Sequence, residues 1–356
     1  MAVVLLLAAK VAISAPLPEF AARPEVDVAV RHQMADQQAV GVAVGLIEDK
    51  RIIYLKGYGL ADRENGEPVN RDTLFRWASI SKCLTAVAAM QLQERGVLDL
   101  HAPVRNYVAE FPDKGAPITT SQLLSHLGGI VHYSNGKVIR AEQAYDSPHP
   151  YGDVIVALDT FKESPLVNQP GEKYSYTTHG FILASAVVQR AGKQRFADQV
   201  RERIAAPAGM TTLQPDYQWV DLPNRAAGYT RKGGKVIRDT DTDVSWKLGG
   251  GGYISNIDDL ARFAVGLLNG AFTNPQTQAQ MWTRQRTNAG ATTKYGLGFN
   301  VSGAGRDLKI SHSGSQEKAK TRMVIYPERG TGVVVMCNSR HVKPELITTA
   351  LFPFVR

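Results

Sequence analysis

The first residues that could do chemistry form the segment Ser-Ile-Ser-Lys at positions 79–82. Apolar residues recur with helical spacing directly after it, which predicts a helix over residues 80–93. A separation of three residues puts the hydroxyl of Ser79 and the amine of Lys82 on one helical face. A serine hydroxyl needs a neighbouring base to act as a nucleophile, and a lysine can be that base when burial or another cation lowers its pKa. On its own, the tetrapeptide more often means a helix-capping serine beside a solvated lysine.

A second candidate segment is Tyr-Ser-Tyr-Thr-Thr at positions 174–178, which ends in Thr178. It lies between a Pro-Gly turn at 170–171 and an apolar helix predicted over residues 180–191. Tyr176 could carry a proton between a serine and its leaving group if a nearby lysine lowered the pKa of the phenol. The alternative is a tyrosine that packs at the entrance of the helix.

The third candidate segment, His-Ser-Gly-Ser at positions 312–315, ends a predicted strand. Its polar side chains would line one wall of a cleft, and Gly314 would let a ligand approach the backbone closely. The N–H of Ser315 could stabilise a developing oxyanion together with the N–H groups at the start of the helix that carries Ser79. The alternative is a turn at a sheet edge in which His312 has its hydrogen bonds satisfied.

The elements that must position these segments are strands at the two ends of the chain and helices between them. Strands are predicted over residues 40–47, 51–58, 308–313, 321–326 and 332–338, with turns at 48–50 and 327–330. Helices are predicted over residues 80–93, 120–127 and 180–191, from a capping box at 255–258 to Gly270, and over 344–351. The economical architecture is an antiparallel sheet built from both ends, with a helical region inserted between them.

Composition narrows the class of protein. The 356 residues are 44% hydrophobic and 21% charged, which excludes disordered, collagen-like and coiled-coil chains. Two cysteines, Cys83 and Cys337, exclude a disulfide framework and a cysteine-rich zinc module. The net charge of +8 is spread over many positions without a basic run. A nucleic-acid binder is therefore a weak alternative, which predicts a steep salt dependence of DNA binding.

The three segments, taken in this order, resemble the motifs of the penicillin-recognising serine hydrolases: Ser-x-x-Lys, Tyr-x-(Asn/Ser/Thr) and (Lys/His)-(Ser/Thr)-Gly. Other stretches are similar to landmarks of the class C β-lactamase-related group, which includes D-alanyl-D-alanine carboxypeptidases, D-aminopeptidases and family VIII esterases. These stretches are residues 75–82, 118–130, 251–255, 259–261 and 326–330. Within the group, the chain is most similar to the serine β-lactamase-like branch that bacteria and mitochondria share.

The resemblance implies an α/β (α+β) fold of the β-lactamase/transpeptidase type. Such a fold has an antiparallel sheet flanked by the terminal helices, with an inserted all-helical lobe. On this sequence the sheet lobe is expected over residues 25–78 and 282–356, and the helical lobe, with the nucleophile helix, over 79–281. Residues 1–24 are expected to form a signal peptide or an N-terminal arm.

The resemblance also implies a role for each motif residue. Ser79 would be the nucleophile that forms an acyl-enzyme, and Lys82 and Tyr176 would transfer protons. The backbone N–H groups of Ser79 and Ser315 would form the oxyanion hole. Ser313 would be positioned for a carboxylate or amide of the substrate.

Two departures from the family pattern affect the expected substrate. Thr178 stands where class C β-lactamases have an asparagine, and His312 replaces the lysine of Lys-Thr-Gly. Both departures favour peptidase or esterase activity over efficient β-lactamase activity. The expected function is a serine hydrolase of amide or ester bonds, in peptides, simple esters or β-lactams, that needs no cofactor and no metal. The alternative is a non-catalytic or slow-turnover penicillin-binding sensor, or a scaffold.

Several residues near the motifs are interpreted without a catalytic role. His126 and His132 lack carboxylate or cysteine partners at metal-ligand spacing, so a structural role is predicted for both. Cys83 is interpreted as a small buried hydrophobe. A separate group of cations follows the third motif and either contacts an anionic substrate or forms a solvated surface: Lys318, Lys320 and Arg322.

The N-terminal residues indicate in which cellular compartment the protein is expected. Residues 2–9 are apolar and the run resumes after Lys10, but it is too short to span a bilayer. It resembles the core of a signal peptide that ends at 13–15. A periplasmic or secreted protein is therefore expected, or a cytoplasmic one if the run is only an arm. The expected partner is a small-molecule or peptide substrate.

Overall fold

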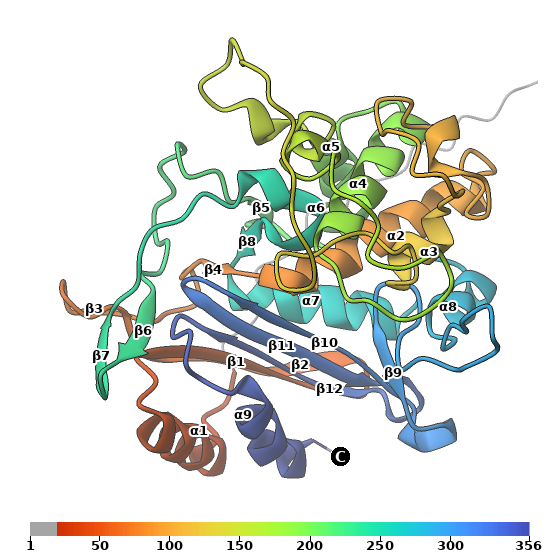
Figure 1. Cartoon of the computed structure of the whole chain (residues 1–356). Coiled ribbons are helices and arrows are strands. Elements are labelled where there is room, and N and C mark those ends of the chain that lie inside the picture. Colours follow the sequence, from red (N-terminus) through yellow and green to blue (C-terminus); the bar gives the residue numbers. More distant parts are fainter. Residues whose placement is uncertain (1–19, 356) are drawn as a thin grey trace, which may run out of the picture.

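A seven-stranded antiparallel sheet forms the base of the protein, whose structure is a computed structural model that describes residues 20–355 (Figure 1). The strand order is β3-β2-β1-β12-β11-β10-β9. The strands are β1 (Gly41–Glu48), β2 (Arg51–Asp62), β3 (Glu67–Pro68), β9 (Asn300–Ser302), β10 (Lys309–Gln316), β11 (Ala319–Tyr326) and β12 (Thr331–Cys337). β1 pairs with β12, with Val44 opposite Val335, so the two ends of the chain meet in the middle of the sheet. The predicted sheet is confirmed.

The two central strands are apolar on both faces because both faces are covered. Successive side chains of a strand point to opposite sides. Val42 and Val44 of β1 therefore pack with helices on one face, while Ala43 and Ile47 join the larger core on the other.

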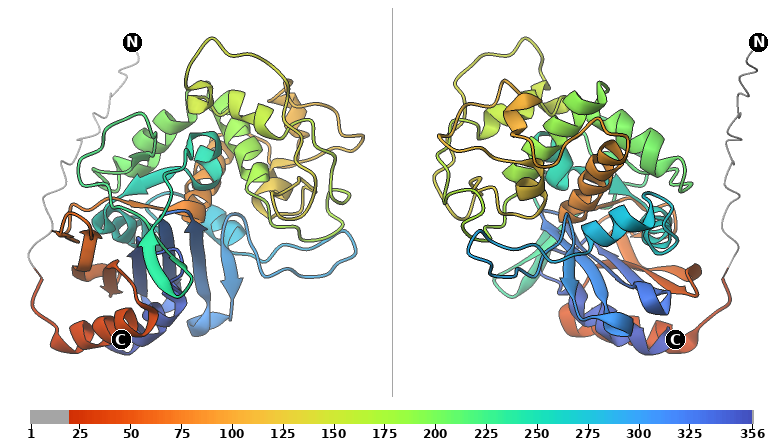
Figure 2. Two further views of the ribbon diagram at one scale, coloured as in Figure 1. Left: turned by 60° about the vertical axis from the view of Figure 1, so that its left-hand side comes forward. Right: turned by 90° about the vertical axis from the view of Figure 1, so that its right-hand side faces the viewer.

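The two terminal helices lie side by side on the first of these faces (Figures 1 and 2). They are α1 (Pro24–Gln37) and α9 (Pro344–Leu351). Val26 and Val30 are the two buried residues of α1, four positions apart on one side of the helix. The sheet is thus flanked by the terminal helices, as predicted.

The other helices gather on the opposite side of the sheet (Figure 2). They are α2 (Ser81–Glu94), α3 (Thr120–Leu124), α4 (His179–Gly192), α5 (Phe196–Val200), α6 (Leu248–Gly251), α7 (Ile257–Leu268) and α8 (Pro275–Met281). This region also holds a small sheet, so it is not wholly helical: β4 (Phe75–Arg76), β8 (Tyr253–Ser255) and β5 (Gln214–Pro215). A hairpin of β6 (Tyr229–Lys232) and β7 (Lys235–Arg238) lies beside the end of β2, where Arg63 donates to the carbonyl of Val236 at 3.1 Å. Among residues 20–355, no helix is long and apolar enough to cross a membrane.

Three local predictions differ from the structure. The helix predicted over 120–127 ends at Leu124, because His126 takes a left-handed conformation with φ 60° and turns the chain. The residue that caps α7 is Asn256, whose side chain accepts a hydrogen bond from the N–H of Asp259. Helix α7 itself packs on β1 and β12, although the expected boundary put it in the helical lobe.

The N-terminal prediction falls mostly on residues that the structure does not describe. The signal peptide or arm was expected over residues 1–24, and residues 1–19 lie outside the described part of the chain. The domain boundaries at 78/79 and 281/282 stay predictions.

Candidate active site

Ser79 lies in a single 3₁₀ turn, Ala78–Ile80, that runs directly into α2. Ala78, just before it, has a φ of 47°, a left-handed conformation that residues other than glycine rarely adopt. Such conformations persist only where the surrounding structure holds them. Here the turn lies between β4 and α2 and packs against β10, so the Ser79 hydroxyl is held at the junction of sheet and helices.

Lys82 is completely buried and its amine reaches three oxygen atoms. Nζ lies 3.1 Å from Oγ of Ser79, 3.3 Å from Oγ1 of Thr178 and 2.6 Å from the carbonyl oxygen of Gly250. None of the carboxylates within residues 20–355 pairs with it. Burial holds the pKa of Lys82 well below its ordinary range, and the charge of Lys247 lowers it further.

A neutral Lys82 fits this arrangement. A neutral amine has two N–H groups and one lone pair. The Gly250 carbonyl and the Thr178 hydroxyl can accept the two N–H groups, which leaves the lone pair for the hydroxyl proton of Ser79. The structure thus brings together the two side chains that the spacing of the first motif places on one helical face.

Tyr176 completes the hydrogen bonds of Ser79. Its hydroxyl donates to Oγ of Ser79 at 2.9 Å. Burial raises the pKa of Tyr176 above its ordinary value, although the bond to Ser79 lowers it somewhat. The predicted role of Tyr176 depends on a lysine that lowers this pKa, whereas burial raises it. The reason is geometric: Nζ of Lys82 lies 5.0 Å from the centroid of the Tyr176 ring, and its hydrogen bonds go to other groups. Tyr176 therefore keeps its proton in the resting site.

Two buried histidines hold the backbone that follows Tyr176. Nδ1 of His126 accepts the N–H of Thr177 at 3.2 Å, and Nδ1 of His132 accepts the N–H of Thr178 at 3.1 Å. The ring of His126 also packs on that of Tyr176, with centroids 4.3 Å apart. Burial, and then the charge of Lys82, lowers the pKa of both histidines, that of His132 to about 3. Both are neutral positioning residues, in keeping with the structural role predicted for them.

His312 is buried behind the site as a neutral imidazole. Nε2 lies 2.7 Å from the hydroxyl of Tyr295, and Nδ1 lies 2.8 Å from the carbonyl oxygen of Ser313. The carbonyl can only accept, so Nδ1 carries the proton and Nε2 accepts from Tyr295. Burial, with a smaller effect of Lys82, lowers the pKa of His312 to about 3. The family pattern has a lysine here, whereas this chain has an uncharged ring.

The hydroxyl of Ser313 does not reach the group around Ser79. It accepts from Arg322 at 2.7 Å and lies 3.2 Å from a carboxylate oxygen of Glu345 on α9. The physical reason is the alternation of a strand, because neighbours such as His312 and Ser313 point to opposite faces of the sheet. The expectation that Ser313 meets the substrate is therefore not supported. Arg322 is engaged on the same far face, and Lys318 pairs with Asp241 at 2.5 Å.

Gly314 allows β10 to pass directly against the turn that carries Ser79. A Cβ atom at this position would lie 2.1 Å from Oγ1 of Thr321 and 2.4 Å from the carbonyl oxygen of Trp77. Thr321 also donates a hydrogen bond to that carbonyl at 2.8 Å. Ser315, the next residue, lies on the strand that packs against the turn of Ser79, and the oxyanion role of its N–H stays a prediction.

Comparison with known proteins agrees with the motifs. The family model described as Beta-lactamase matches residues 26–352. The chain belongs to the beta-lactamase family. Serine beta-lactamase-like protein LACTB, mitochondrial, from Mus musculus is 27% identical, over 87% of this chain and 76% of that protein. Esterase EstB from Burkholderia gladioli is 28% identical, over 77% of this chain and 78% of the esterase. The structure of the octameric penicillin-binding protein homologue from Pyrococcus abyssi, 23% identical, has a similar fold, with a TM-score of 0.77 over 93% of this chain and 76% of that one.

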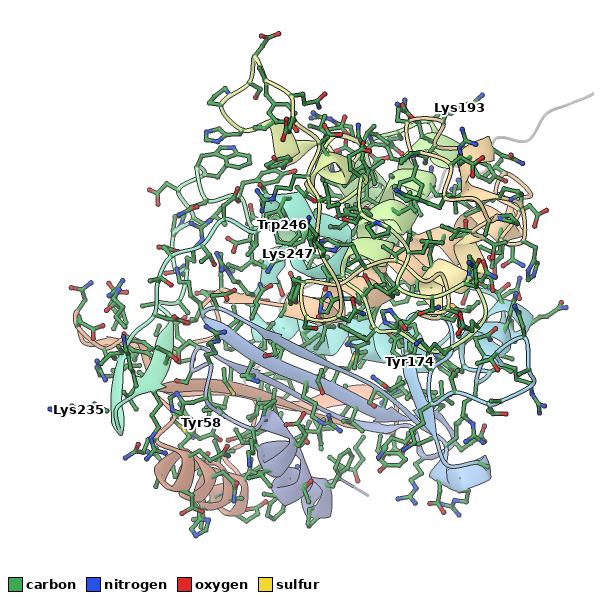
Figure 3. The ribbon with its side chains drawn as sticks, viewed as in Figure 1. Tyr58, Tyr174, Lys193, Lys235, Trp246 and Lys247 are labelled. Carbon is green, nitrogen blue, oxygen red and sulfur yellow. The ribbon has the colours of Figure 1, made fainter. Side chains whose placement is uncertain are left out.

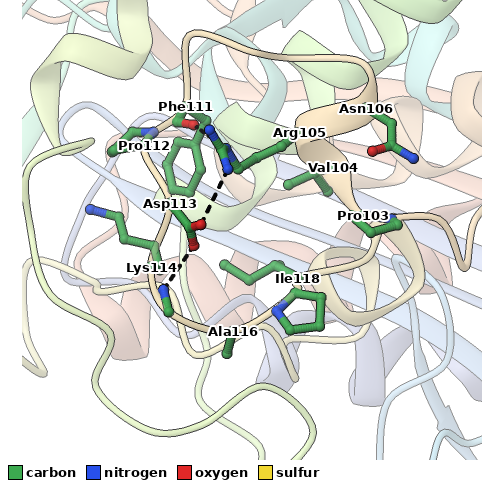
Figure 4. A pocket seen from close by; sticks show the side chains of 12 residues that line it. Pro103, Val104, Arg105, Asn106, Phe111, Pro112, Asp113, Lys114, Ala116 and Ile118 are labelled. Atoms are coloured by element: carbon green, nitrogen blue, oxygen red, sulfur yellow. Dashed lines mark hydrogen bonds and ion pairs between the residues drawn. The ribbon is translucent and has the colours of Figure 1, made fainter.

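A cavity of about 720 Å³ lies at the end of β10 that carries Ser315. Ser315 lines it from β10, and Trp246 and Lys247 line it from the helical side (Figure 3). A second cavity, of about 410 Å³, lies among residues 103–118, where Arg105 pairs with Asp113 (Figure 4). None of the site residues lines this second cavity, and among residues 20–355 no three His, Cys, Asp or Glu side chains gather as a metal site would need.

Sequence reasoning missed three residues around the site. The carbonyl of Gly250 accepts from Lys82, Tyr295 binds His312, and Lys247 lowers the pKa of Lys82. A Cβ atom at Gly250 would lie 2.7 Å from a methyl carbon of Thr178, so glycine permits this close approach. The signal available was the glycine run 249–252, of which only residues 251 and 252 fall in the stretch 251–255 that resembles a family landmark.

The close packing at Gly314 predicts that a larger residue there lowers both stability and activity. We expect Gly314→Ala to lower the free energy of unfolding by about 1–3 kcal/mol, because the added methyl group overpacks the contact between β10 and the Ser79 turn. The variant should also lose activity, since β10 must move away from Ser79. Urea unfolding and kcat/KM measure the two effects. Gly152→Ala is the control, because its Cβ would meet nothing nearer than 3.9 Å. Equal stability of the two variants would contradict the prediction.

Proposed function

We propose that the chain is a serine hydrolase that cleaves amide or ester bonds through an acyl-enzyme on Ser79. The observation that supports this most directly is that two side chains, Lys82 and Tyr176, both contact Oγ of Ser79. Oγ of Ser79 lies within reach of a buried amine, Lys82 at 3.1 Å, and a half-buried phenol, Tyr176 at 2.9 Å. A nucleophile next to a base, with a second proton donor aimed at the same atom, is what acyl transfer requires.

In the acylation step, neutral Lys82 takes the hydroxyl proton of Ser79 while Oγ attacks the carbonyl carbon of the substrate. The negative charge that develops on the carbonyl oxygen is stabilised by the backbone N–H groups of Ser79 and Ser315. As the bond to the leaving nitrogen or oxygen breaks, Tyr176 gives that atom its proton. Tyr176 then regains a proton from the Lys82 ammonium, so the acyl-enzyme forms with the base neutral again.

Deacylation repeats these steps with water as the nucleophile. The Lys82–Tyr176 pair removes a proton from water, the hydroxide oxygen bonds to the acyl carbon, and the ester bond to Oγ breaks. The proton returns to Oγ and the carboxylic acid leaves. The same two residues serve both halves, as microscopic reversibility requires of one acid–base pair.

The environment of two residues favours a peptidase or esterase over an efficient β-lactamase. Thr178 is buried and its hydroxyl already contacts Lys82, so it is not free to recognise an amide side chain as the asparagine of class C enzymes does. His312 is neutral and bonded to Tyr295, so no cation stands in the place of the family lysine. Esterase EstB, among the relatives, bears the name of one of these activities.

The test is covalent labelling followed by turnover assays. A fluorophosphonate should add one phosphonyl group to the protein, detected by intact mass, and peptide mapping should place it on Ser79. A panel of p-nitrophenyl esters, D-amino-acid amides and nitrocefin should then show multiple turnover of an ester or amide and little of nitrocefin. Labelling elsewhere, or none, would refute the proposal. Acylation without turnover would instead indicate the slow penicillin-binding sensor.

Tyr176 offers a test of the proton-transfer assignment. We expect Tyr176→Phe to lower kcat/KM by about a hundredfold to ten thousandfold, the usual contribution of a positioned acid or base. The ring contact with His126 would survive, so stability should change little. Tyr174→Phe is the matched control, because Tyr174 is 41% exposed and its hydroxyl has no hydrogen bond within residues 20–355. If both variants keep full activity, Tyr176 is not the proton donor.

A further inference from the structure

Arg76 is a buried cation whose guanidinium contacts three separate segments of the chain. It belongs to β4, its side chain is 5% exposed, and Ser79 follows three residues later. Nε lies 2.5 Å from a carboxylate oxygen of Asp216, a side chain that is completely buried. The other two nitrogens donate to the carbonyl oxygen of Thr242 at 2.9 Å, to its hydroxyl at 3.3 Å, and to the carbonyl oxygen of Glu317 at 3.5 Å. One side chain thus joins segments that lie far apart in the sequence.

A buried ion pair such as Arg76 with Asp216 adds little stability by itself. The cost of removing two charges from water roughly offsets their attraction, and well-packed apolar residues of similar volume are often as stable. A guanidinium differs from an apolar side chain because its five N–H groups form a rigid planar fork. Arg76 uses this fork to hold a carboxylate and two peptide carbonyls at fixed places relative to one another. What an apolar residue could not replace is therefore the geometry.

The contact with Thr242 holds the segment that leads to α6. From Thr242 the chain runs through a single 3₁₀ turn directly into this helix. Within α6, the carbonyl of Gly250 accepts from Lys82 at 2.6 Å. Asp216 is bonded to the end of the same helix, because its N–H donates to the carbonyl of Gly252 at 2.7 Å. A shift of this segment would move the acceptor that orients the amine of Lys82.

The contact with Glu317 holds the end of β10. Glu317 directly follows this strand and stands two residues after Ser315, whose N–H is the predicted oxyanion donor. β10 packs against the turn that carries Ser79, and β4, which carries Arg76, leads into that turn. The residues that line the cavity beside Ser315 do not include Arg76. Arg76 would therefore act through its neighbours and not on a substrate.

We propose that Arg76 is a positioning residue that fixes the turn of Ser79, the segment before α6 and the end of β10 relative to one another. The inference rests on the proposed function and deepens it. Without the fork, the three segments would keep their fold but lose their fixed spacing. A displacement of reacting groups by about 1 Å can lower a rate about a hundredfold. Ground-state binding depends less on this spacing, so the loss should fall on kcat.

Arg76→Lys tests the role with the charge retained. An ammonium can still pair with Asp216, but one nitrogen cannot replace three that stand at different places. We expect kcat for the best p-nitrophenyl ester to fall about tenfold to a hundredfold while KM changes less than about twofold. Fluorophosphonate labelling should slow by a similar factor. That reaction forms a bond from Oγ of Ser79 to phosphorus and expels fluoride, so it needs the same alignment.

Arg225→Lys is the matched control, because Arg225 is the other cation beside Asp216. Its guanidinium lies 3.0 Å from the second carboxylate oxygen and donates to the carbonyls of Tyr217 and Val220, in its own part of the chain. The two lysine variants should lower the midpoint of urea unfolding by similar amounts. Only Arg76→Lys should lose kcat, since Arg225 contacts none of the segments that carry the site.

Arg76→Met is a second variant, which lacks both the charge and the fork. Asp216 keeps Arg225 as its counter-charge in this variant, so the protein should still fold. We expect a loss of kcat at least as large as in Arg76→Lys, again with little change in KM. Urea unfolding of the same preparations shows that the rates belong to folded protein.

The results that overturn the inference differ from those that overturn the proposed function. If both Arg76 variants keep kcat within about twofold of the wild type, Arg76 has no positioning role, while serine hydrolase chemistry stands. An equal loss of kcat in Arg225→Lys refutes the role as well, because the loss then follows stability alone. If the wild type neither labels at Ser79 nor turns over any ester or amide, the proposed function fails and the inference fails with it.

Discussion

Ser79→Ala is expected to abolish fluorophosphonate labelling and to lower kcat/KM for the best ester by about ten thousandfold or more. The reason is that the variant has no atom that can form the acyl bond. Lys82 and Tyr176 lose the oxygen that they share, so their proton transfers have no target. Intact mass after labelling and initial rates with a p-nitrophenyl ester measure the two effects. Residual hydrolysis would come only from water that the remaining groups orient.

Ser81→Ala is the matched control, since it removes the other hydroxyl of the same segment. Oγ of Ser81 accepts the N–H of Tyr253 at 3.3 Å. The variant should therefore keep its activity while losing about 1–3 kcal/mol of stability at most, the cost of one unsatisfied buried donor. A Ser79→Ala protein that turns over esters at the wild-type rate would refute the whole mechanism.

The difference between Ser79 and Ser81 could be predicted from spacing alone. Only Ser79 has a lysine three residues later, and helical geometry puts those two side chains on one face. The contribution of Tyr176 could not be predicted in this way, because it lies 97 residues from Ser79 in the chain. Tyr176 was assigned to the site because it stands in the second of three motifs in the family order. Its pKa is raised by burial, which depends on packing between distant segments and not on a local pattern.

In the third motif, strand geometry alone predicts that only one of two neighbouring side chains faces the nucleophile. Adjacent residues of a strand point to opposite faces, so His312 and Ser313 could not both face the nucleophile. Both are predicted site residues, whereas the hydroxyl of Ser313 lies 3.2 Å from a carboxylate oxygen of Glu345 on α9. The partner of His312, Tyr295, lies in a segment without regular secondary structure. Neither hydrophobic periodicity nor secondary-structure propensity identifies a residue in such a segment.

The strands and the long helices were predictable because their apolar periods match the faces that they bury. Helix α1 was not assigned from its own sequence, since only Val26 and Val30 are buried and its apolar face is short. The glycine run at 249–252 likewise revealed no function beforehand. Its role depends on a backbone carbonyl, and a carbonyl leaves no mark in the sequence except the small residue that lets Lys82 approach it.

Lys82→Met is expected to lower kcat/KM by about a hundredfold to ten thousandfold, because methionine keeps the apolar stem but removes the general base. Lys82→Arg should be no better, since a guanidinium stays protonated at any working pH and cannot accept the proton of Ser79. In the wild type, kcat/KM should rise with pH as Lys82 loses its proton, and should level off well below the ordinary pKa of lysine, because burial lowers that pKa. Rates across the pH range for both proteins measure the effect.

The pH profile also identifies the group that titrates. Below its pKa Lys82 is an ammonium with no lone pair for Ser79, so activity must fall as the pH falls. Burial lowers the pKa values of His132 and His312 to about 3, so the titration of either ring would change the activity near that pH. Because the charge of Lys247 lowers the pKa of Lys82, Lys247→Met should move the acid limb to higher pH. If Lys82→Met keeps the same acid limb as the wild type, that limb belongs to another group and Lys82 is not the base.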